Sequence, residues 1–168
     1  ILKSRAVAER AVKRLKQHYE IRSLSPDIRF ESSDVDLETT IKDGTYRVSF
    51  LDATGNYQLN DASGRRIGIG KLGQPFRAGG ISFTLSSKES PMAGASLEIH
   101  LKSLVSLADA LRAKMAVQVV RGTNIAGVKI RDENPQEAVL LANGVAESYV
   151  DFTREQKIQQ LVSMQKFL

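Results

Sequence analysis

Glycines and a lysine of the type that could cradle a phosphate gather in one short stretch of this chain: Gly64, Gly68, Gly70, Lys71 and Gly73. A phosphate-binding loop of the Walker A type needs Gly, four residues, and then Gly-Lys-Ser/Thr. Here Leu72 follows Lys71, and alternating apolar residues flank the stretch. The pattern therefore predicts a hairpin whose glycines serve turns and bulges.

The densest carboxylate cluster consists of Asp34, Asp36 and Glu38. It lacks the Asp-x-Asp-x-Asp-Gly register of a calcium loop, so a solvated acidic strand or loop is favoured. A hydrolase with paired carboxylates ranks last among the alternatives.

The two histidines, His18 and His100, are expected at the end of the first helix and on a solvent-facing strand position. Neither has a second ligand three or four residues away, and the chain contains no cysteine. We therefore expect no catalytic residue, no cofactor and no metal site.

The net charge of +5 belongs entirely to residues 1–22, because the rest of the chain is balanced. Such a basic helix could face anionic lipid, nucleic acid or an acidic polymer, or simply solvent. Nucleic acid is disfavoured, since Tyr19 is the only aromatic residue among the first 29 and the chain has no tryptophan for base stacking. The side chains predicted to face a membrane or a neighbouring protomer are Arg10, Lys13, Arg14 and Lys16.

Helical periodicity predicts three helices. The first begins at Ser4, a plausible N-cap, and runs to about Tyr19, and the second covers 107–115. The third starts at Asn134-Pro135, which suits a helix N-terminus, and continues to Leu168. Its predicted packed face carries Val139, Ala142, Val145, Ala146, Tyr149 and Phe152.

Strand periodicity dominates from about residue 45 to 101, where short alternating runs are separated by Gly, Asp and Asn turns. An antiparallel meander or small sandwich is predicted there, and two further strands at 116–120 and 126–131. Residues 28–43 favour no structure. The fold class is thus α+β, with a mixed sheet and packed helices, a small antiparallel β insertion at about 45–101, and a long C-terminal helix in one domain, 1–168.

No run of the chain approaches the ~20 apolar residues needed to cross a bilayer. The chain begins within one helical pattern and ends within another. We therefore expect it to be a fragment of a longer protein, in which membrane segments could lie outside this sequence.

Three blocks of sequence carry a resemblance to a known family. They are Ile1–Ala8 with Val12 and Leu15; Gly55–Leu59, Gly64, Gly68–Gly73 and Ser82–Leu85; and Leu107-Ala108, Leu111, Val117, Thr123, Ile125–Ile130, Pro135, Ala138, Ala142-Asn143 and Tyr149. In this order they resemble the periplasmic domain of the polysaccharide co-polymerases, the bacterial chain-length determinant and exopolysaccharide-export proteins.

The resemblance implies a non-enzymatic periplasmic scaffold of an inner-membrane protein. Such a scaffold would help to control the chain length or export of exopolysaccharide, capsule or lipopolysaccharide O-antigen. The implied partners are further copies in a ring, a polysaccharide polymerase or outer-membrane export protein, and the polysaccharide itself, with a tyrosine kinase domain fused or separate. The alternative is a carbohydrate-binding module of a cell-envelope protein, which the β insertion supports and the lack of tryptophan weakens.

Overall fold

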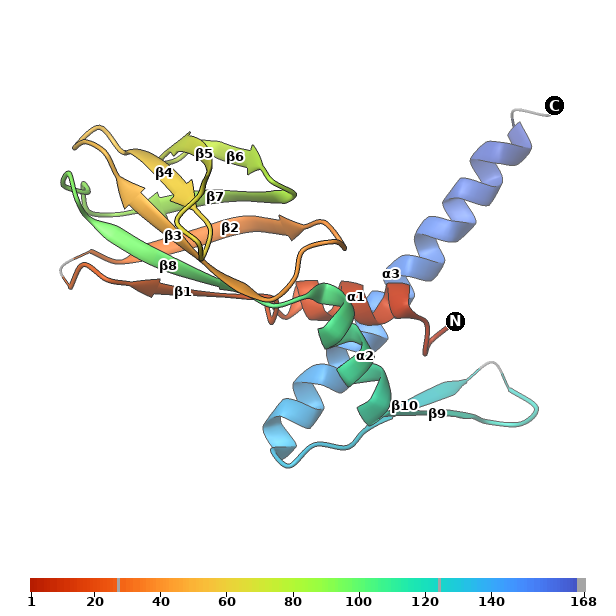
Figure 1. Cartoon of the computed structure of the whole chain (residues 1–168). Helices are drawn as coiled ribbons and strands as arrows, with labels where there is room; N and C mark the ends of the chain where they lie inside the picture. Colours follow the sequence, from red (N-terminus) through yellow and green to blue (C-terminus); the bar gives the residue numbers. More distant parts are fainter. Residues whose placement is uncertain (27, 124, 166–168) are drawn as a thin grey trace. The chain divides into compact units, whose positions relative to one another are not determined.

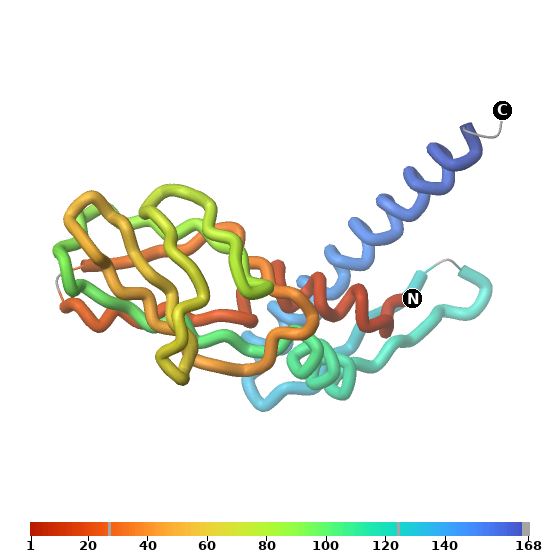
Figure 2. Tube along the Cα trace, turned by 45° about the horizontal axis from the view of Figure 1, so that its top comes forward, coloured from red at the N-terminus to blue at the C-terminus, as the bar shows by residue number. Residues whose placement is uncertain are grey.

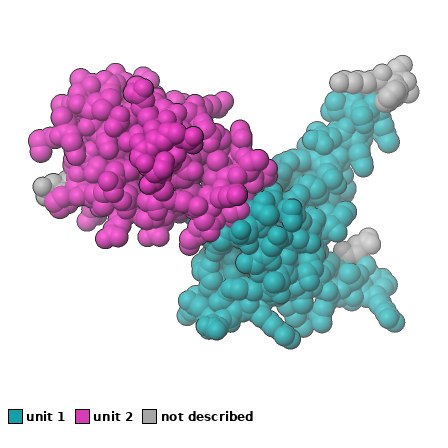
Figure 3. Space-filling view, in the orientation of Figure 1, with its two compact units in different colours: residues 1–17, 105–168 teal, residues 18–104 magenta. Residues whose placement is uncertain are grey.

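A computed structural model describes residues 1–26, 28–123 and 125–165. The chain folds into two compact units, which are coloured separately in Figure 3. Unit 1 consists of residues 1–17 and 105–168, and unit 2 of residues 18–104. Unit 2 is therefore an insertion between two separated segments of unit 1.

Unit 1 is built around the long helix α3 (Pro135–Gln165), against which α1 (Arg5–Arg14) packs. Figure 2 shows α1 alongside the middle of α3. The other elements are α2 (Leu104–Lys114), which starts at the boundary residue Leu104, and a hairpin of β9 (Met115–Val119) and β10 (Ala126–Ile130). The contact between the two helices buries Val7, Ala11 and Val12 of α1 and Leu141 and Val145 of α3.

The helix starts follow the expected capping chemistry. The Ser4 hydroxyl accepts a hydrogen bond from the Val7 N–H, and Asn134 Oδ1 accepts from the Gln136 N–H at 3.0 Å. These bonds satisfy N–H groups that have no carbonyl partner in a first helical turn. The predicted caps at Ser4 and Asn134 are both confirmed.

Unit 2 consists of two antiparallel sheets (Figure 1). The five-stranded sheet has the order β1-β8-β3-β4-β5 and the three-stranded sheet the order β2-β7-β6. The strands are β1 (Tyr19–Ser23), β2 (Phe30–Leu37), β3 (Gly44–Phe50), β4 (Asn56–Asn60), β5 (Arg66–Lys71), β6 (Pro75–Ala78), β7 (Ile81–Ser87) and β8 (Ser96–Leu101). Alternate residues of both sheets are buried, which is the pattern of two sheets sharing one core.

Aromatic rings fill the centre of unit 2. Tyr57 contacts Phe50, Phe76 and Phe83, with ring centroids 5.7–6.4 Å apart. The inward positions of β5 opposite this cluster are Gly68 and Gly70. A Cβ at Gly68 would lie 3.0 Å from Phe76 Cζ, and one at Gly70 would overlap the Tyr57 ring. These two glycines make room for aromatic rings. The stretch therefore forms the predicted hairpin and not a phosphate-binding loop.

The α+β class, the β insertion and the long C-terminal helix are confirmed. The predicted end of the first helix at Tyr19 is wrong, because α1 ends at Arg14 and Lys16 takes a left-handed φ of 54°. The β unit is also larger than predicted, since β1 and β2 precede residue 45. The predicted helix continuation over 166–168 lies outside the described residues.

Candidate functional site

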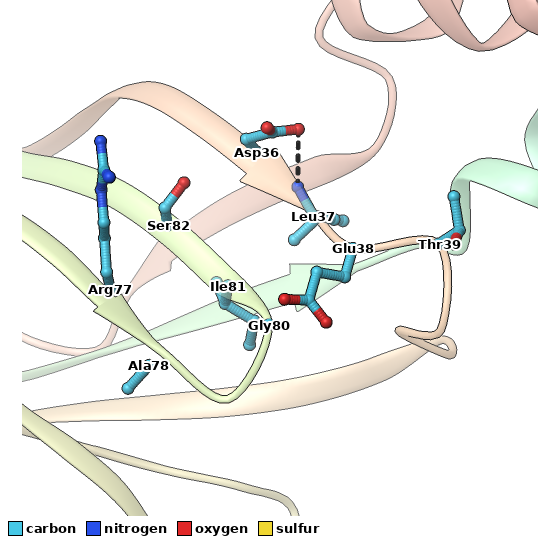
Figure 4. Close-up of a pocket in the computed structure, with 9 residues that line it drawn as sticks. All are labelled: Asp36, Leu37, Glu38, Thr39, Arg77, Ala78, Gly80, Ile81 and Ser82. Atoms are coloured by element: carbon cyan, nitrogen blue, oxygen red, sulfur yellow. Dashed lines mark hydrogen bonds between the residues drawn. The ribbon is translucent and has the colours of Figure 1, made fainter.

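An open hollow of about 600 Å³ lies on the outer face of the three-stranded sheet. Figure 4 shows Asp36, Ser82 and Arg77 in a row across β2, β7 and β6, as their strand register requires. The Asp36 carboxylate accepts a hydrogen bond from the Leu37 N–H at 3.0 Å. The hollow is an open surface recess that is lined by polar side chains and by Leu37, Ala78 and Ile81.

The acidic cluster singled out in the sequence does not converge on one point. Asp36 and Glu38 line the hollow, whereas Asp34 sits at a bulge in β2 with a left-handed φ of 54°. Across residues 1–26, 28–123 and 125–165, no three acidic or histidine side chains are placed to hold a metal ion. The predicted solvated acidic strand or loop is confirmed, because Asp34, Asp36 and Glu38 are all exposed.

The histidines differ in their surroundings. His18 was predicted at the end of a helix, but it is buried and its Nε2 lies 3.0 Å from the Val35 carbonyl oxygen. His100 lies on the outer face of β8, where Nδ1 is 3.0 Å from Thr45 Oγ1 and Nε2 is 3.7 Å from Glu98. The His18 ring is therefore enclosed by the protein, whereas the His100 ring is half-buried on a sheet surface of unit 2.

Two of the basic side chains of α1, Arg10 and Arg14, bind acidic side chains of α3. Arg10 donates to both carboxylate oxygens of Glu155, at 2.8 and 2.7 Å, and its guanidinium lies 5.8 Å from the centroid of the Phe152 ring. Arg14 pairs with Glu147 at 3.1 Å and with Asp151. An orientation of Arg10 and Arg14 toward a membrane or protomer stays a prediction, and within this chain both bind α3.

The other two side chains of that predicted set lie differently. Lys13 is half-buried in α1, and Lys16 is exposed immediately after the helix. Gln17 donates to Glu137 at 2.6 Å, which extends the polar contact between the start of unit 1 and α3. The charge imbalance of residues 1–22 is thus partly matched by acidic residues of α3 that are distant in sequence.

Two pKa values report the Arg10 contact. The hydrogen bond from Arg10 lowers the pKa of Glu155, and the same bond raises the pKa of Arg10. Both shifts have the direction expected when a bond favours the charged forms of the partners.

A second apolar face of α3 is not covered by any residue that the structure describes. It carries Val139, Leu140, Ala146, Val150, Ile158, Leu161 and Met164, all of them exposed. At 3.6 residues per turn, Val139, Ala146, Val150, Leu161 and Met164 fall roughly opposite the buried face of Leu141, Val145 and Ser148, whereas Leu140 and Ile158 lie about a quarter turn from it. Val139 and Ala146 were predicted on the packed face, and the structure places them on the open one. Leu161 retains 63% of its accessible surface.

The end of the β9–β10 hairpin is a second exposed apolar site. Val119, Val120 and Ile125 are 70%, 49% and 62% exposed. Two-stranded hairpins are marginal in water unless another element covers them. The apolar end of this hairpin and the open face of α3 together form what we call the assembly surface of unit 1.

The sequence contains a signal for this surface, which is missed when only one apolar face of the last helix is considered. Apolar residues recur along α3 on two faces rather than one, and a helix that is apolar on two faces is normally covered on both. A large exposed apolar patch marks a protein or membrane interaction site. None of the helices in the described ranges has the length and apolar character that crossing a bilayer requires.

Comparisons with known proteins gave matches among solved structures alone, since no family model and no curated protein matches the chain. The chain is similar to crystal structures of FlgL from Xanthomonas campestris. One has 18% identity, a TM-score of 0.39, and coverage of 78% of this chain and 41% of that one. A second has 15% identity, a TM-score of 0.38, and coverage of 89% and 52%.

It is also similar to the flagellar junction protein FlgL from Legionella pneumophila, with 12% identity and a TM-score of 0.39. That match covers 89% of this chain and 51% of the other. The chain thus spans about half of the length of the structures it matches. With TM-scores below 0.5, the similarity assigns no function by itself.

The resemblance to polysaccharide co-polymerases is wrong, because the similar structures are FlgL proteins. The predicted roles in polysaccharide chain length, capsule and lipopolysaccharide are therefore wrong, and so is the carbohydrate-binding alternative. The predicted partners are also wrong, namely the polymerase, the export protein, the co-polymerase ring and the polysaccharide. The predicted location, a periplasmic domain of an inner-membrane protein, is wrong as well. The motifs behind the resemblance have local explanations, such as the Asn134 cap and the glycines that face Tyr57 and Phe76.

Proposed function

We propose that this chain is part of a non-enzymatic structural subunit, and that its assembly surface packs against other protein subunits in a flagellar junction. The observation that carries the proposal is the open apolar face of α3. One face of this helix is buried against α1, while Ile158 and Leu161, which lie outside that face, are 54% and 63% exposed. Covering such a face removes apolar surface from water, at about 25 cal/mol per Å².

The end of α3 has a composition suited to a protein partner. From Ile158 to Gln165 it carries no charged side chain, although Arg154, Glu155 and Lys157 precede this segment. Interfaces between subunits are depleted of charge at their centre. An interfacial helix on a lipid surface would instead carry lysine or arginine along its polar face, and here that face holds Gln159, Gln160 and Ser163.

A non-enzymatic role is consistent with the surface recesses. The hollow at Asp36 and Arg77 is open, and the other polar recesses lie at loops and strand ends. Enzyme sites are usually enclosed and combine apolar walls with a few convergent polar groups. The flagellar setting is the hypothesis suggested by the name of the Legionella structure, and it is tested directly below.

The experiment replaces Ile158 and Leu161 together by Gln in the chromosomal gene of the bacterium that encodes this chain. We expect flagellar filaments, counted by electron microscopy, and swimming motility to be lost, because the subunit folds but no longer packs against its neighbours. The matched control is Gln160→Ala with Ser163→Ala, which changes the opposite side of the same two turns and should leave the filaments intact.

A deletion of the whole gene separates the two parts of the proposal. Normal filaments in the deletion strain would overturn the flagellar setting. Filaments that disappear on deletion but persist with both Gln substitutions would overturn the role of the α3 face. Circular dichroism of the purified double variant establishes that the substitution leaves the fold unchanged.

A further inference from the structure

Charge is separated by sign across the strands of unit 2. Strands β5 and β6 carry Arg66, Lys71 and Arg77 and no acidic residue. Strands β1 and β2 carry four acidic residues and one basic residue, namely Glu20, Glu31, Asp34, Asp36 and Arg22. The two pairs of strands thus have net charges of +3 and −3.

These strands form opposite narrow sides of the unit. The five-stranded sheet has β1 at one edge and β5 at the other, and the three-stranded sheet has β2 and β6 at its edges. β5 contacts β6, and β1 contacts β2 (Figure 1). The β5–β6 side therefore has a net positive charge and the β1–β2 side a net negative one, although Asp36 and Arg77, one residue of each group, line the same hollow on the three-stranded sheet.

The central strands carry no net charge. Arg47 of β3 and Glu98 of β8 form an ion pair at 2.9 Å, while β4 and β7 contain no charged residue. Both groups of charged residues lie outside this neutral centre, and all eight of the edge residues named above are exposed. Ile69, 60% exposed on β5, places an apolar side chain among the basic ones.

Protection of sheet edges against aggregation does not account for this pattern. Charged residues on edge strands prevent edge-to-edge pairing, and residues of either sign serve that purpose. Separation by sign does more, because it makes the two sides complementary to each other. Every copy of the chain then presents one surface of each sign.

We propose that the β5–β6 side of one copy docks on the β1–β2 side of a second copy. The inference deepens the proposed function, on which it rests for the view that the chain works within an assembly. A contact between two different sides of the same molecule is heterologous, so each copy can bind two others in a head-to-tail row. Complementary charge determines which sides meet and accelerates their encounter.

The test uses two charge-altered forms of the full chain. The first carries Arg66→Glu, Lys71→Glu and Arg77→Glu, so that both of its sides are acidic. The second carries Glu20→Lys, Glu31→Lys and Asp34→Asn, so that both of its sides are basic. Asn is used at position 34 because it tolerates the left-handed backbone found there.

Sedimentation velocity at ~0.01 M salt, where the screening length is about 30 Å, measures the association. The unaltered chain should show a mass that increases with concentration, and each altered form alone should associate roughly tenfold more weakly or not at all. An equimolar mixture of the two forms should associate again, because each now meets a partner of opposite sign. Recovery in the mixture also demonstrates that both forms are folded.

At ~1 M salt, where the screening length is about 3 Å, association through charge should disappear. A monomeric unaltered chain at low salt, undiminished association of either altered form, or a mixture that stays monomeric would each overturn the proposal. The form with Ile158→Gln and Leu161→Gln should retain the salt-sensitive association. The experiments therefore distinguish a wrong proposal about the α3 face from a wrong proposal about the charged sides.

Discussion

Arg10 and Glu155 are joined by two parallel hydrogen bonds, although they are far apart in the sequence. The pair connects the second turn of α1 to a part of α3 whose own side chains are largely exposed. Paired bonds between a planar guanidinium and a carboxylate fix the geometry of both groups. Arg10 is thus the outermost of the described contacts that hold α3 to α1.

Replacing Arg10 by Ala should loosen α3 locally rather than unfold unit 1. Exposed ion pairs contribute little to stability, so we expect amide exchange around residues 152–158 to accelerate roughly two- to fivefold. Hydrogen-exchange mass spectrometry measures this acceleration. The control is Lys157→Ala, which removes an exposed cation from the turn of α3 that carries Glu155. Equal acceleration in both variants would contradict a specific role of the Arg10 bonds.

The same pair gives a pH dependence. The pKa of Glu155 is lowered, first by its hydrogen bond with Arg10, so the unfolded chain takes up a proton more readily than the folded one. The contribution is therefore complete above the ordinary glutamate pKa and is lost as the pH falls through the lowered value. Exchange in the Arg10→Ala variant and the unaltered chain should converge in that acidic range, and a constant difference would contradict this assignment.

Gly70→Ala should destabilise unit 2 by about 1–3 kcal/mol, because the new methyl would lie only 2.7 Å from Tyr57 Cε2 in a packed core. Denaturant unfolding measures the loss. The matched control is Gly127→Ala in β10, where the nearest atom would be 3.8 Å away. Tyr57→Leu should make room for the methyl, so the double variant should lose less than the sum of the single losses.

Tyr57 has a buried hydroxyl without a hydrogen-bond partner among the residues that the structure describes. Tyr57→Phe removes that hydroxyl, and we expect the free energy of unfolding to stay the same or to rise by up to about 1 kcal/mol. A fall of the same size would show that the hydroxyl is bound. Tyr46→Phe, on a half-buried tyrosine of β3, is the control.

Burial also raises the pKa of Tyr57 to about 12. The unfolded chain ionises at an ordinary tyrosine pKa near 10, so it loses the proton first. The stability that the neutral ring contributes is complete below that value and is lost as the pH rises to about 12. Unfolding followed between these pH values should show a steeper loss for the unaltered chain than for Tyr57→Phe, and identical slopes would contradict the assignment.

Ser148 lies on the buried face of α3, and its hydroxyl has no partner in the described ranges. Ser148→Ala should stabilise unit 1 by about 1 kcal/mol, since it removes a buried unpaired group and favours the helix. Ser163→Ala gains the helix preference but loses the exposed hydrogen bond from its hydroxyl to the Gln160 carbonyl at 2.8 Å, so it should change the stability by only a few tenths of a kcal/mol. Destabilisation by Ser148→Ala would indicate that the hydroxyl is hydrogen-bonded.

The sequence predicts the elements whose periodicity reflects burial on one side. Val48 and Phe50 alternate with polar residues and lie in β3, and Val7 and Ala11 mark the buried side of α1. β2 was missed because its centre is polar and a bulge at Asp34 interrupts the alternation.

The functional surfaces were harder to predict because they depend on which positions remain uncovered. Val139 and Val145 satisfy the same helical spacing, yet the first is 60% exposed and the second is fully buried. Likewise, residues 23–168 are neutral in sum, and only the sheet order reveals that Arg66 and Glu31 lie on opposite sides of unit 2.

The strand pairing at the boundary of unit 2 has a consequence for how this protein can change. Tyr19 pairs with Leu101, and the Lys102 N–H donates to the His18 carbonyl at 2.9 Å, so the chain begins and completes this unit at neighbouring points. A short loop could therefore replace residues 18–104 without stretching the backbone of unit 1. Gain or loss of the whole β unit would then leave the packing of the helices in unit 1 unchanged, and it would add or remove both charged sides together, because both belong to this unit.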